Sequence, residues 1–533
     1  MASSVSTSEA TPLIQNTSTP TNGTLGIDGN NGYNGGTSSK NKGGNDNNNN
    51  SSRLDRLQVS LRRSASTFSE AVSSMKRIGY LGSMSIAVNS LTGPAMLCLP
   101  DTYQRSGLIP TTLVIIFVCI LSALCCLHMS NTISKVPGND TFTMDIGFSE
   151  CFRYFWGPRS FAYTQLLFFC CITCLNVSSI VDTAQVVDTF LGHWVKGGSG
   201  AINLVWDNDT ERFQIRWLHW SYQECSEEML ITGECLPFLD DDGILFTLGY
   251  AITLLIFLPM ALMDLKENAA MQVIGFLVLL VTSLGFIILF IQEGVDLKDG
   301  DVSLWGTEWG SLFGVVLFNF ALVIAIPAWL YEKEPNVDVP LVVHGSSILS
   351  AVLYVVIGIL GAVSMPYVSQ NMLESLMSGE FGTVMQLCAS IFAFFIIGLG
   401  CPLFSVLTRM NLAGSGLMSW STANALAVYL PFLSSWIFYQ GDAITQLLSW
   451  GGIIFTSLIA FILPLLLALH SLDTSDDEGA VDVYSPFHFY SKKSKKNVLI
   501  ILLVLAVLSI IAAIFGNVFN DDLAYLAEKL NKQ

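Results

Sequence analysis

Residues Gly82–Pro100 read GSMSIAVNSLTGPAMLCLP, and this stretch decides the fold. It is apolar enough to enter a bilayer and long enough to cross one, since a membrane helix needs about 20 residues. Its centre, Asn89–Pro94, nevertheless reads NSLTGP, and Gly and Pro cost roughly 1 and 3 kcal/mol against Ala in a helix interior. Pro94 also lacks the N–H that would continue the helix. The sequence therefore predicts a membrane helix that is interrupted near its middle.

Two interpretations of this interruption are open. Backbone groups freed at membrane depth need protein, water or a ligand as partners, and secondary transporters use such groups to bind substrates and coupling ions. Carbonyls around residues 89–93 could then accept from an ammonium group, while N–H groups after Gly93 donate to a carboxylate, which suits a zwitterion. Alternatively, the segment is a Pro-kinked structural helix, in which Ser90 and Thr92 bond back to their own helix.

Composition places the chain among polytopic membrane proteins. Of its 533 residues, 51% are hydrophobic and 13% charged, the mean hydropathy is +0.54 and the net charge is −17. The negative charge argues against nucleic-acid binding. The sequence contains no HExxH, GxSxG, Walker or GxGxxG motif, and its 6 histidines lack metal-ligand spacing. Neither an enzyme, nor a metal site, nor a cofactor is expected.

Repeated apolar runs predict an all-α polytopic membrane fold of about eleven helices. They are expected at residues 80–102, 108–133, 160–191, 244–263, 269–292, 310–331, 340–366, 381–407, 421–439, 444–470 and 497–519. The sixth carries Asn319 in mid-membrane and Pro327 past the centre, so the first and sixth spans are both interrupted. Inverted-repeat transporters have their discontinuous helices at these two positions. The spacing therefore predicts five helices, five more in inverted repeat, and one further helix.

The basic residues predict the orientation of the membrane domain, residues 78–519. Most of the 25 Lys and Arg residues fall on the side of the N-terminus, which the positive-inside rule assigns to the cytosol. The loop 192–243 and the end of the chain, 520–533, then face a lumen or the outside. The loop holds the glycosylation acceptor Asn208. It also holds two cysteines that either form a disulfide or stay free thiols, Cys225 and Cys235.

The first 77 residues are rich in Ser, Thr, Asn and Gly. Such a composition cannot bury a core, so a disordered cytosolic tail is predicted. Within it, Glu9, Leu13 and Ile14 match the acidic-x-x-x-Leu-Leu/Ile pattern that clathrin adaptors read for sorting to endosomes and lysosomes. Chance matches to so short a pattern are common.

Polar residues inside the spans are costly and therefore informative. Asp182 belongs either to a proton or cation site or to a water-exposed helix end, and Asp188 is assigned to the water-exposed end. Ser405 and Thr408 either face the core or cap the eighth helix. Arg409 is interpreted as an anchor at the cytosolic boundary.

Three segments carry a resemblance to a known family. Asn89–Pro100 resembles the Asn-x-x-x-Gly-x-x-(Ile/Met)-Leu-x-(Leu/Ile)-Pro signature of the amino acid transporter transmembrane family, the amino acid/auxin permeases, with Gly107 following. Phe318–Pro340 and the spacing Pro402-x6-Arg409 resemble its sixth and eighth spans less specifically. The resemblance covers about residues 78–518. It implies a leucine-transporter-like fold and amino acid transport driven by protons or sodium.

The resemblance also implies roles for single residues. Substrate contacts would be made by the backbone of Ser90, Leu91, Thr92, Gly93 and Pro94, with Asn319 and Phe320 opposite. Asn89 would contact the substrate region or an ion, and it joins Asp182, Ser405 and Thr408 as a candidate for ion coupling. Sodium-dependent relatives carry a hydroxyl residue near the position of Gly400. Glycine offers no side-chain ligand, so proton coupling is favoured over sodium.

The sequence thus predicts a proton-coupled amino acid transporter of an endolysosomal or vacuolar membrane, or of the plasma membrane. Its expected partners are the amino acid, the proton, the lipid bilayer and, through the tail, clathrin adaptors. Two alternative functions are open: an amino acid sensor that signals through residues 1–77, and a sodium-coupled importer of the plasma membrane.

Overall fold

A computed structural model of the chain describes most of the membrane domain. It covers residues 78–207, 212–221, 244–294, 302–309, 312–365, 368, 372–377, 381–414, 416, 418–440, 450–474, 484, 486 and 491–531. These residues belong to one compact unit, Ala65–Gln533. The sorting signal, the candidate disulfide and the glycosylation site lie outside the described residues and stay predictions: Glu9, Leu13, Ile14, Cys225, Cys235 and Asn208.

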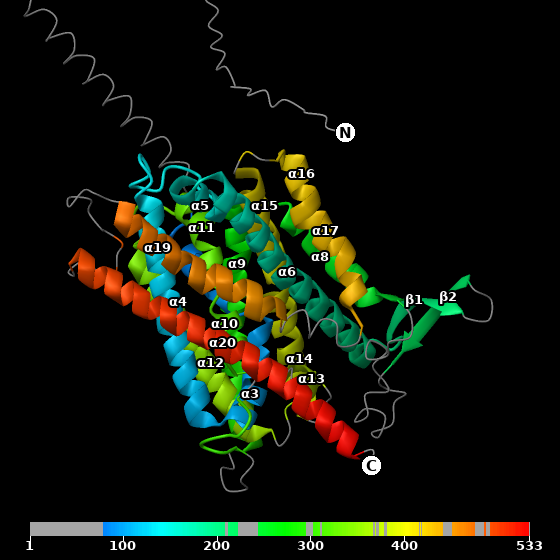
Figure 1. Cartoon of the computed structure of the whole chain (residues 1–533). Helices are drawn as coiled ribbons and strands as arrows, with labels where there is room; N and C mark the ends of the chain where they lie inside the picture. Colours follow the sequence, from blue (N-terminus) through cyan, green and yellow to red (C-terminus); the bar gives the residue numbers. More distant parts are fainter. Residues whose placement is uncertain are drawn as a thin grey trace, which may run out of the picture. The chain divides into compact units, whose positions relative to one another are not determined.

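Helices dominate the described residues (Figure 1). Eight helical segments are long and apolar enough to cross a membrane. They are α4 (Leu108–Ser134), α6 (Pro158–Trp194), α9 (Leu265–Glu293), α10 with α11 (Leu312–Asn319 and Ile326–Glu332), α12 (Val339–Ser364), α14 with α15 (Gly382–Phe392 and Gly398–Gly414), a π-helical stretch with α19 (Leu463–Thr474), and the first part of α20 (Lys492–Asn531).

Three shorter segments complete the spans that the sequence predicts. They are α2 with α3 (Tyr80–Leu91 and Leu99–Ser106), α8 (Leu248–Ala261), and α16 with α17 (Trp420–Asn424 and Leu430–Ser434). With the eight long segments they account for the eleven expected spans, so the predicted fold class is confirmed. Two further short helices lie in connections, α5 (Phe148–Trp156) and α13 (Met372–Met377).

A small antiparallel sheet lies where the sequence analysis expected only a loop and the start of a helix. Its strands are β1 (Ser199–Asp207), β2 (Arg212–Trp220) and β3 (Ile244–Thr247), in the order β2-β1-β3. The expected fourth span therefore begins at Leu248 and not at residue 244. The boundary was wrong because ILFT, the sequence of β3, is as apolar as the helix that follows. Hydropathy does not distinguish such a strand from a helix.

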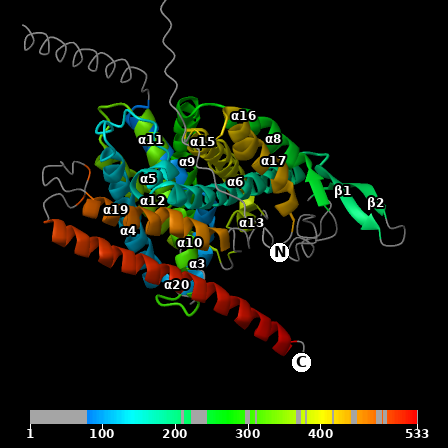
Figure 2. The same ribbon diagram turned by 45° about the horizontal axis from the view of Figure 1, so that its top comes forward.

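The interrupted spans lie inside the bundle. α2 contacts α9 and α12, α10 contacts α4, and α6 packs along α8 and α15. α20 lies along the outside of the bundle next to α19 in both views (Figures 1 and 2). Only 28% of its apolar window is buried, against 72% for the span formed by α10 and α11. The sixth span is therefore a core element, whereas α20 is exposed to lipid.

Candidate functional site

The first span is interrupted where the sequence predicts. α2 ends at Leu91, Thr92 and Gly93 leave the helix, and a 3-10 turn, Pro94–Cys98, leads into α3. The Thr92 N–H still donates to the Val88 carbonyl at 2.8 Å, and the Gly93 N–H donates to the Leu91 carbonyl at 3.0 Å. The backbone thus turns tightly after one last helical bond, and the predicted break is confirmed.

The sixth span has a matching interruption. α10 ends at Asn319, and a short 3-10 turn, Leu322–Ile324, precedes α11. The Ser122 hydroxyl of α4 donates to the Phe320 carbonyl at 2.7 Å. This contact satisfies one of the backbone groups that the interruption removes from the helix. The predicted pair of discontinuous helices is therefore present.

A tyrosine of α12 joins the two interruptions. The Tyr354 hydroxyl donates to the Leu91 carbonyl and lies 3.4 Å from the Asn319 carbonyl, so it contacts the last residue of both α2 and α10. Its buried ring packs edge-on against Phe320, with centroids 5.3 Å apart. The hydroxyl has one proton, so the two carbonyls share it. The sequence analysis missed Tyr354 because one tyrosine in an apolar helix resembles any core residue.

Asn89 is held by a polar network that crosses the bundle. Its Nδ2 donates to the backbone oxygen and to Oε1 of Gln272 on α9, both at 2.8 Å. Gln272 in turn donates to Asn268 Oδ1 at 2.9 Å and to the Leu399 carbonyl at 3.0 Å. The amide nitrogen of Asn89 therefore ties the first span to the fifth and eighth. Its buried Oδ1 has no hydrogen-bond partner among the described residues, so this one atom is available to a ligand.

The hydroxyls of Ser90 and Thr92 bond back to their own helix. Ser90 donates to the Ala87 carbonyl and Thr92 to the Val88 carbonyl, each at 2.9 Å. The contacts of these two side chains are those expected for a Pro-kinked structural helix. Any substrate contact at these positions therefore falls to the main chain.

Gly93 borders open space. A Cβ added to it would meet no described atom within 4 Å. Its φ of −97° lies in a region that any residue adopts, so the local backbone does not require glycine here. The absence of a side chain leaves the main chain at the interruption accessible.

A polar cluster lies between α6 and α15. Asn176 Nδ2 donates to Ser405 Oγ at 2.8 Å, and Ser178 Oγ donates to Asp182 Oδ2 at 3.1 Å. Asn176 Oδ1 and Ser179 Oγ have no hydrogen-bond partner in the described part of the chain. The cluster therefore offers oxygen atoms that the protein itself does not use.

Asp182 is buried, with 7% of its surface exposed. This burial removes the interpretation of Asp182 as a water-exposed helix end. α6, which carries Asp182, contacts the 3-10 turn Pro94–Cys98 that follows the first interruption. Asp182 is thus brought close to the interrupted helix.

The two hydroxyl candidates of α15 differ. Ser405 is fully buried and bonds across to Asn176, so it faces the core. Thr408 donates to the Phe404 carbonyl of its own helix at 2.8 Å. A Cβ at Gly400 would lie 3.4 Å from Ser179 Oγ, so a hydroxyl residue there would extend the polar cluster.

Asp188 is not water-exposed, and that prediction was wrong. Its side chain is fully buried. Oδ1 accepts from Ser199 Oγ at 2.6 Å and from the Gly249 N–H at 2.8 Å, and Oδ2 accepts from the Tyr439 hydroxyl. These donors lie on β1, at the start of α8 and after the ninth span. Asp188 connects three elements that are distant in sequence, which no local pattern reveals.

Arg409 is buried, with 3% of its surface exposed. Its guanidinium donates to the Leu262 carbonyl at 2.9 Å and to the Met263 carbonyl. Its Nη2 lies 3.6 Å from Asp264 Oδ1. Arg409 therefore caps the carbonyl end of α8, where a cation is favoured by the helix dipole.

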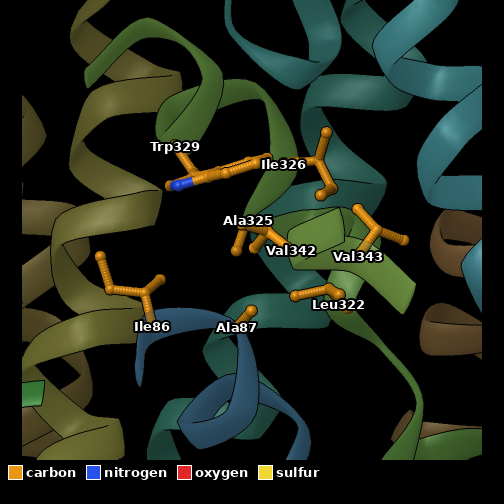
Figure 3. A pocket seen from close by; sticks show the side chains of 8 residues that line it. All are labelled: Ile86, Ala87, Leu322, Ala325, Ile326, Trp329, Val342 and Val343. Carbon is orange, nitrogen blue, oxygen red and sulfur yellow. The ribbon is translucent and has the colours of Figure 1, made fainter. Parts of the chain in front are cut away.

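A small apolar cavity lies beside the interruptions (Figure 3). It is lined by Ile86, Ala87, Leu322, Ala325, Ile326, Trp329, Val342 and Val343. Figure 3 shows the Trp329 indole on one side and Ile86 with Ala87 on the other. The space suits about one water molecule, so it is too small for an amino acid. In this structure the cavity is therefore closed to a substrate.

The chain was compared with known proteins. No family model matches the chain, and no curated protein matches it. Among solved structures, MhsT in complex with L-phenylalanine is similar, with 13% identity, a TM-score of 0.53, and coverage of 81% of this chain and 98% of that chain. A second is Mhp1, a nucleobase-cation-symport-1 family transporter in a closed conformation with bromovinylhydantoin bound, with 11% identity, a TM-score of 0.46, and coverage of 86% and 94%.

The likeness concerns the fold, because the sequence identities are low. It extends over nearly the whole of the MhsT chain, and the two interrupted spans stand at the first and sixth positions. The chain is therefore an integral, multi-pass membrane protein with a leucine-transporter-like fold.

Proposed function

We propose that the chain is a secondary active amino acid transporter that binds its substrate at the two interruptions. One observation carries this proposal: the last carbonyls of α2 and α10, at Leu91 and Asn319, converge on the single hydroxyl of Tyr354. Discontinuous helices that meet at membrane depth form the substrate sites of secondary transporters. MhsT, which shares the fold, was solved with the zwitterion L-phenylalanine.

The proposed site binds the substrate mainly through the main chain. The carboxylate would accept from the Ala95 N–H, since Pro94 has none and the Met96 N–H donates to the Gly93 carbonyl, and the ammonium would donate to the carbonyls that end α2. The open space at Gly93 allows this close approach. Asn319 Oδ1 is buried and has no hydrogen-bond partner within the described residues, so it can accept from the substrate on the opposite side, next to Phe320.

In the closed conformation, Tyr354 stands in for the substrate. Its hydroxyl donates to the Leu91 carbonyl, which is one of the acceptors that the ammonium group would use. Substrate binding then requires that this hydroxyl is displaced and that the small cavity opens. The substrate ammonium would replace the hydroxyl as a donor to the Leu91 carbonyl, so the backbone at the interruption keeps its hydrogen bond with and without substrate.

We propose proton coupling through Asp182. Its carboxyl group is buried next to the first interruption, and its Oδ2 accepts one hydrogen bond, from Ser178. Ionisable residues inside membrane spans are typical of proton relays, so proton binding at Asp182 and the state of the interrupted helix can be linked. Gly400 has no side-chain oxygen that could bind sodium.

Sodium coupling is the second candidate, and a specific observation favours it. Three buried oxygen atoms, Asn89 Oδ1, Asn176 Oδ1 and Ser179 Oγ, have no hydrogen-bond partner in the described part of the chain. Oxygen atoms of this kind are the ligands that hard cations prefer. Substituting sodium by choline separates the two candidates.

A transport assay with purified protein in liposomes tests the proposal. We expect labelled amino acids to accumulate under an inward proton gradient and accumulation to stop when a protonophore collapses the gradient. Asp182→Asn should keep amino acid exchange but lose gradient-driven accumulation, because the amide cannot release a proton. Thr189→Val, which removes from the same helix a hydroxyl that donates to the Gln185 carbonyl, serves as the matched control and should keep both activities. The proposal fails if no amino acid moves under any ion gradient.

The cellular setting is part of the proposal. An endolysosomal or vacuolar membrane is favoured by the tail residues Glu9, Leu13 and Ile14, which would bind clathrin adaptors, and by a lumen-facing loop with Asn208. The N-terminus would lie in the cytosol and the C-terminus in the lumen. A sensor function through residues 1–77 is the alternative. It predicts amino acid binding without net transport.

A further inference from the structure

The outward face of the three-stranded sheet is unusually apolar. Ile202 of β1 pairs with Trp217 of β2 and with Phe246 of β3, and Leu204 pairs with Ile215. Paired residues and their neighbours two positions away share one face of a sheet. Ile215 is 75% exposed, Trp217 72%, Ile202 42% and Phe246 40%. The sheet therefore presents large apolar side chains outward.

Around Ala201 and β3, the opposite face of the sheet packs on the protein. Ala201 and Leu245 are each 1% exposed and belong to the same cluster as Trp220 and Tyr250, and β1 contacts both α6 and α8. Asn203 and Thr247 are also buried on this face. A sheet with one face in water has its polar side chains outside, and this sheet has the reverse pattern. The outward face is therefore unsuited to water.

The sheet is fixed at the ends of two membrane spans. α6 ends at Trp194, shortly before β1, and β3 passes directly into α8 at Leu248. Both figures show the sheet extending outward from these helix ends (Figures 1 and 2). A position at the end of membrane helices is the bilayer interface, where tryptophan is enriched.

The apolar face of the sheet continues into the exposed face of α8. Phe246 is followed by Leu248, 46% exposed, and by Leu255, 74% exposed and two helical turns further on. α8 is a membrane span, and its exposed apolar side chains contact lipid. The outward face of the sheet is thus the continuation of a surface that already faces the bilayer.

We propose that this outward face is a membrane anchor that lies in the interfacial layer of one leaflet. Trp217 would reside at the headgroup level, and Ile202, Ile215 and Phe246 would contact the upper acyl chains. The leaflet is the one on the side that the positive-inside rule assigns to the lumen. The anchor holds the ends of α6 and α8 at a fixed depth. This inference does not depend on the proposed transport activity.

Two neighbouring residues of β2 provide a matched test. Ile215 lies on the outward face and Gln214 on the opposite one, and both are exposed. Ile215→Cys and Gln214→Cys are each labelled with an environment-sensitive fluorophore in the full-length protein in nanodiscs, with the unsubstituted protein as background. We expect the probe at 215 to be blue-shifted and quenched by lipids that carry a shallow spin label. Quenching at 214 should be several-fold weaker.

Two results would overturn the anchor. Equal, water-like emission from both positions, without quenching, would mean that the face is in solvent. A probe at 215 that is shielded from water but not quenched by lipid would mean that protein covers the face, whether a second copy, another protein or another part of this chain. Cross-linking between copies through Ile215→Cys would then identify a second copy.

Discussion

At the residue scale, Tyr354→Phe tests whether one hydroxyl holds both interruptions closed. The variant keeps the ring packing on Phe320 but removes one of the two donors to the Leu91 carbonyl, which retains the Gly93 N–H. A buried hydrogen bond contributes about 0.5–1.5 kcal/mol, so the substrate-free protein should melt at a lower temperature. The substrate ammonium no longer competes with the hydroxyl, so its Kd should fall. Thermal unfolding with and without substrate measures both effects.

Tyr250→Phe is the matched control for this variant. The Tyr250 hydroxyl is also buried, and it contacts the Phe432 carbonyl and Ser435 Oγ, away from the interruptions. Its loss should lower the melting temperature without changing the substrate Kd. A Tyr354→Phe protein that melts normally but no longer binds substrate would contradict the stand-in role and make the hydroxyl a direct ligand.

Gly93→Val separates a binding role of the interruption from a structural one. No described atom lies within 4 Å of the added Cβ, and the backbone conformation suits any residue. The Val variant should therefore fold and reach its membrane. Gly93→Ala should increase the free energy of unfolding by about 0.4–1 kcal/mol, because alanine lowers the conformational entropy of the unfolded chain. Transport per molecule at the membrane should be lost in the Val variant because its side chain fills the approach to the main chain. Normal transport would show that the break is only structural.

At the scale of elements, the sequence was informative where chemistry is local. Asn89, Gly93 and Pro94 stand within one apolar run, and together they are incompatible with a continuous helix, so the interruption could be predicted. The π-helical turn Ala393–Ile397 inside the eighth span has no such signature. β1 and β2 lie within residues 192–243, which were predicted as a loop. Partners of Asp188 could not be predicted because three separate elements supply them.

Asp188→Asn tests whether that residue is a connector. The carboxylate accepts from Ser199, Gly249 and Tyr439. An amide offers one oxygen and places its N–H groups against donors, and hydrogen bonds to charged groups are each worth about 1.5–3 kcal/mol. We expect a lower melting temperature and faster hydrogen exchange at residues 199–207 and 244–249. Ser199→Ala removes only one of these donors, so it should lower the melting temperature and speed up hydrogen exchange at the same residues, but to a smaller extent. Unchanged exchange together with lost proton coupling would instead make Asp188 a proton site.

At the scale of the whole molecule, hydropathy and charge predicted the membrane spans and their arrangement as five helices, five more in inverted repeat, and one further helix. They could not predict which helices touch, because contacts between membrane helices depend on shape and on single polar residues. The Arg409 cap on α8 and the Tyr354 contact to two carbonyls are examples. Both join segments that are far apart in sequence, and no local pattern indicates the partners of either side chain.

A contact at the start of the first span links it to the end of the sixth. The Ile78 N–H donates to the Glu332 carbonyl at 3.4 Å, and the Glu334 N–H donates to the Ile78 carbonyl at 3.0 Å. Ile78 is 2% exposed. The two interrupted spans are thus joined by backbone hydrogen bonds at the end that the positive-inside rule assigns to the cytosol, immediately after the predicted tail.

Two deletions therefore separate the tail from this contact. Removal of residues 2–77 keeps Ile78 and should leave transport in liposomes unchanged, while in cells the protein should shift from endolysosomal membranes to the surface. Removal of residues 2–79 also deletes the backbone bonds to Glu332 and Glu334, so the closed state should be destabilised and amino acids should leak without a proton gradient. Loss of transport in the shorter deletion would place the tail in the transport cycle. Intact transport with a lost cellular response would support the sensor function.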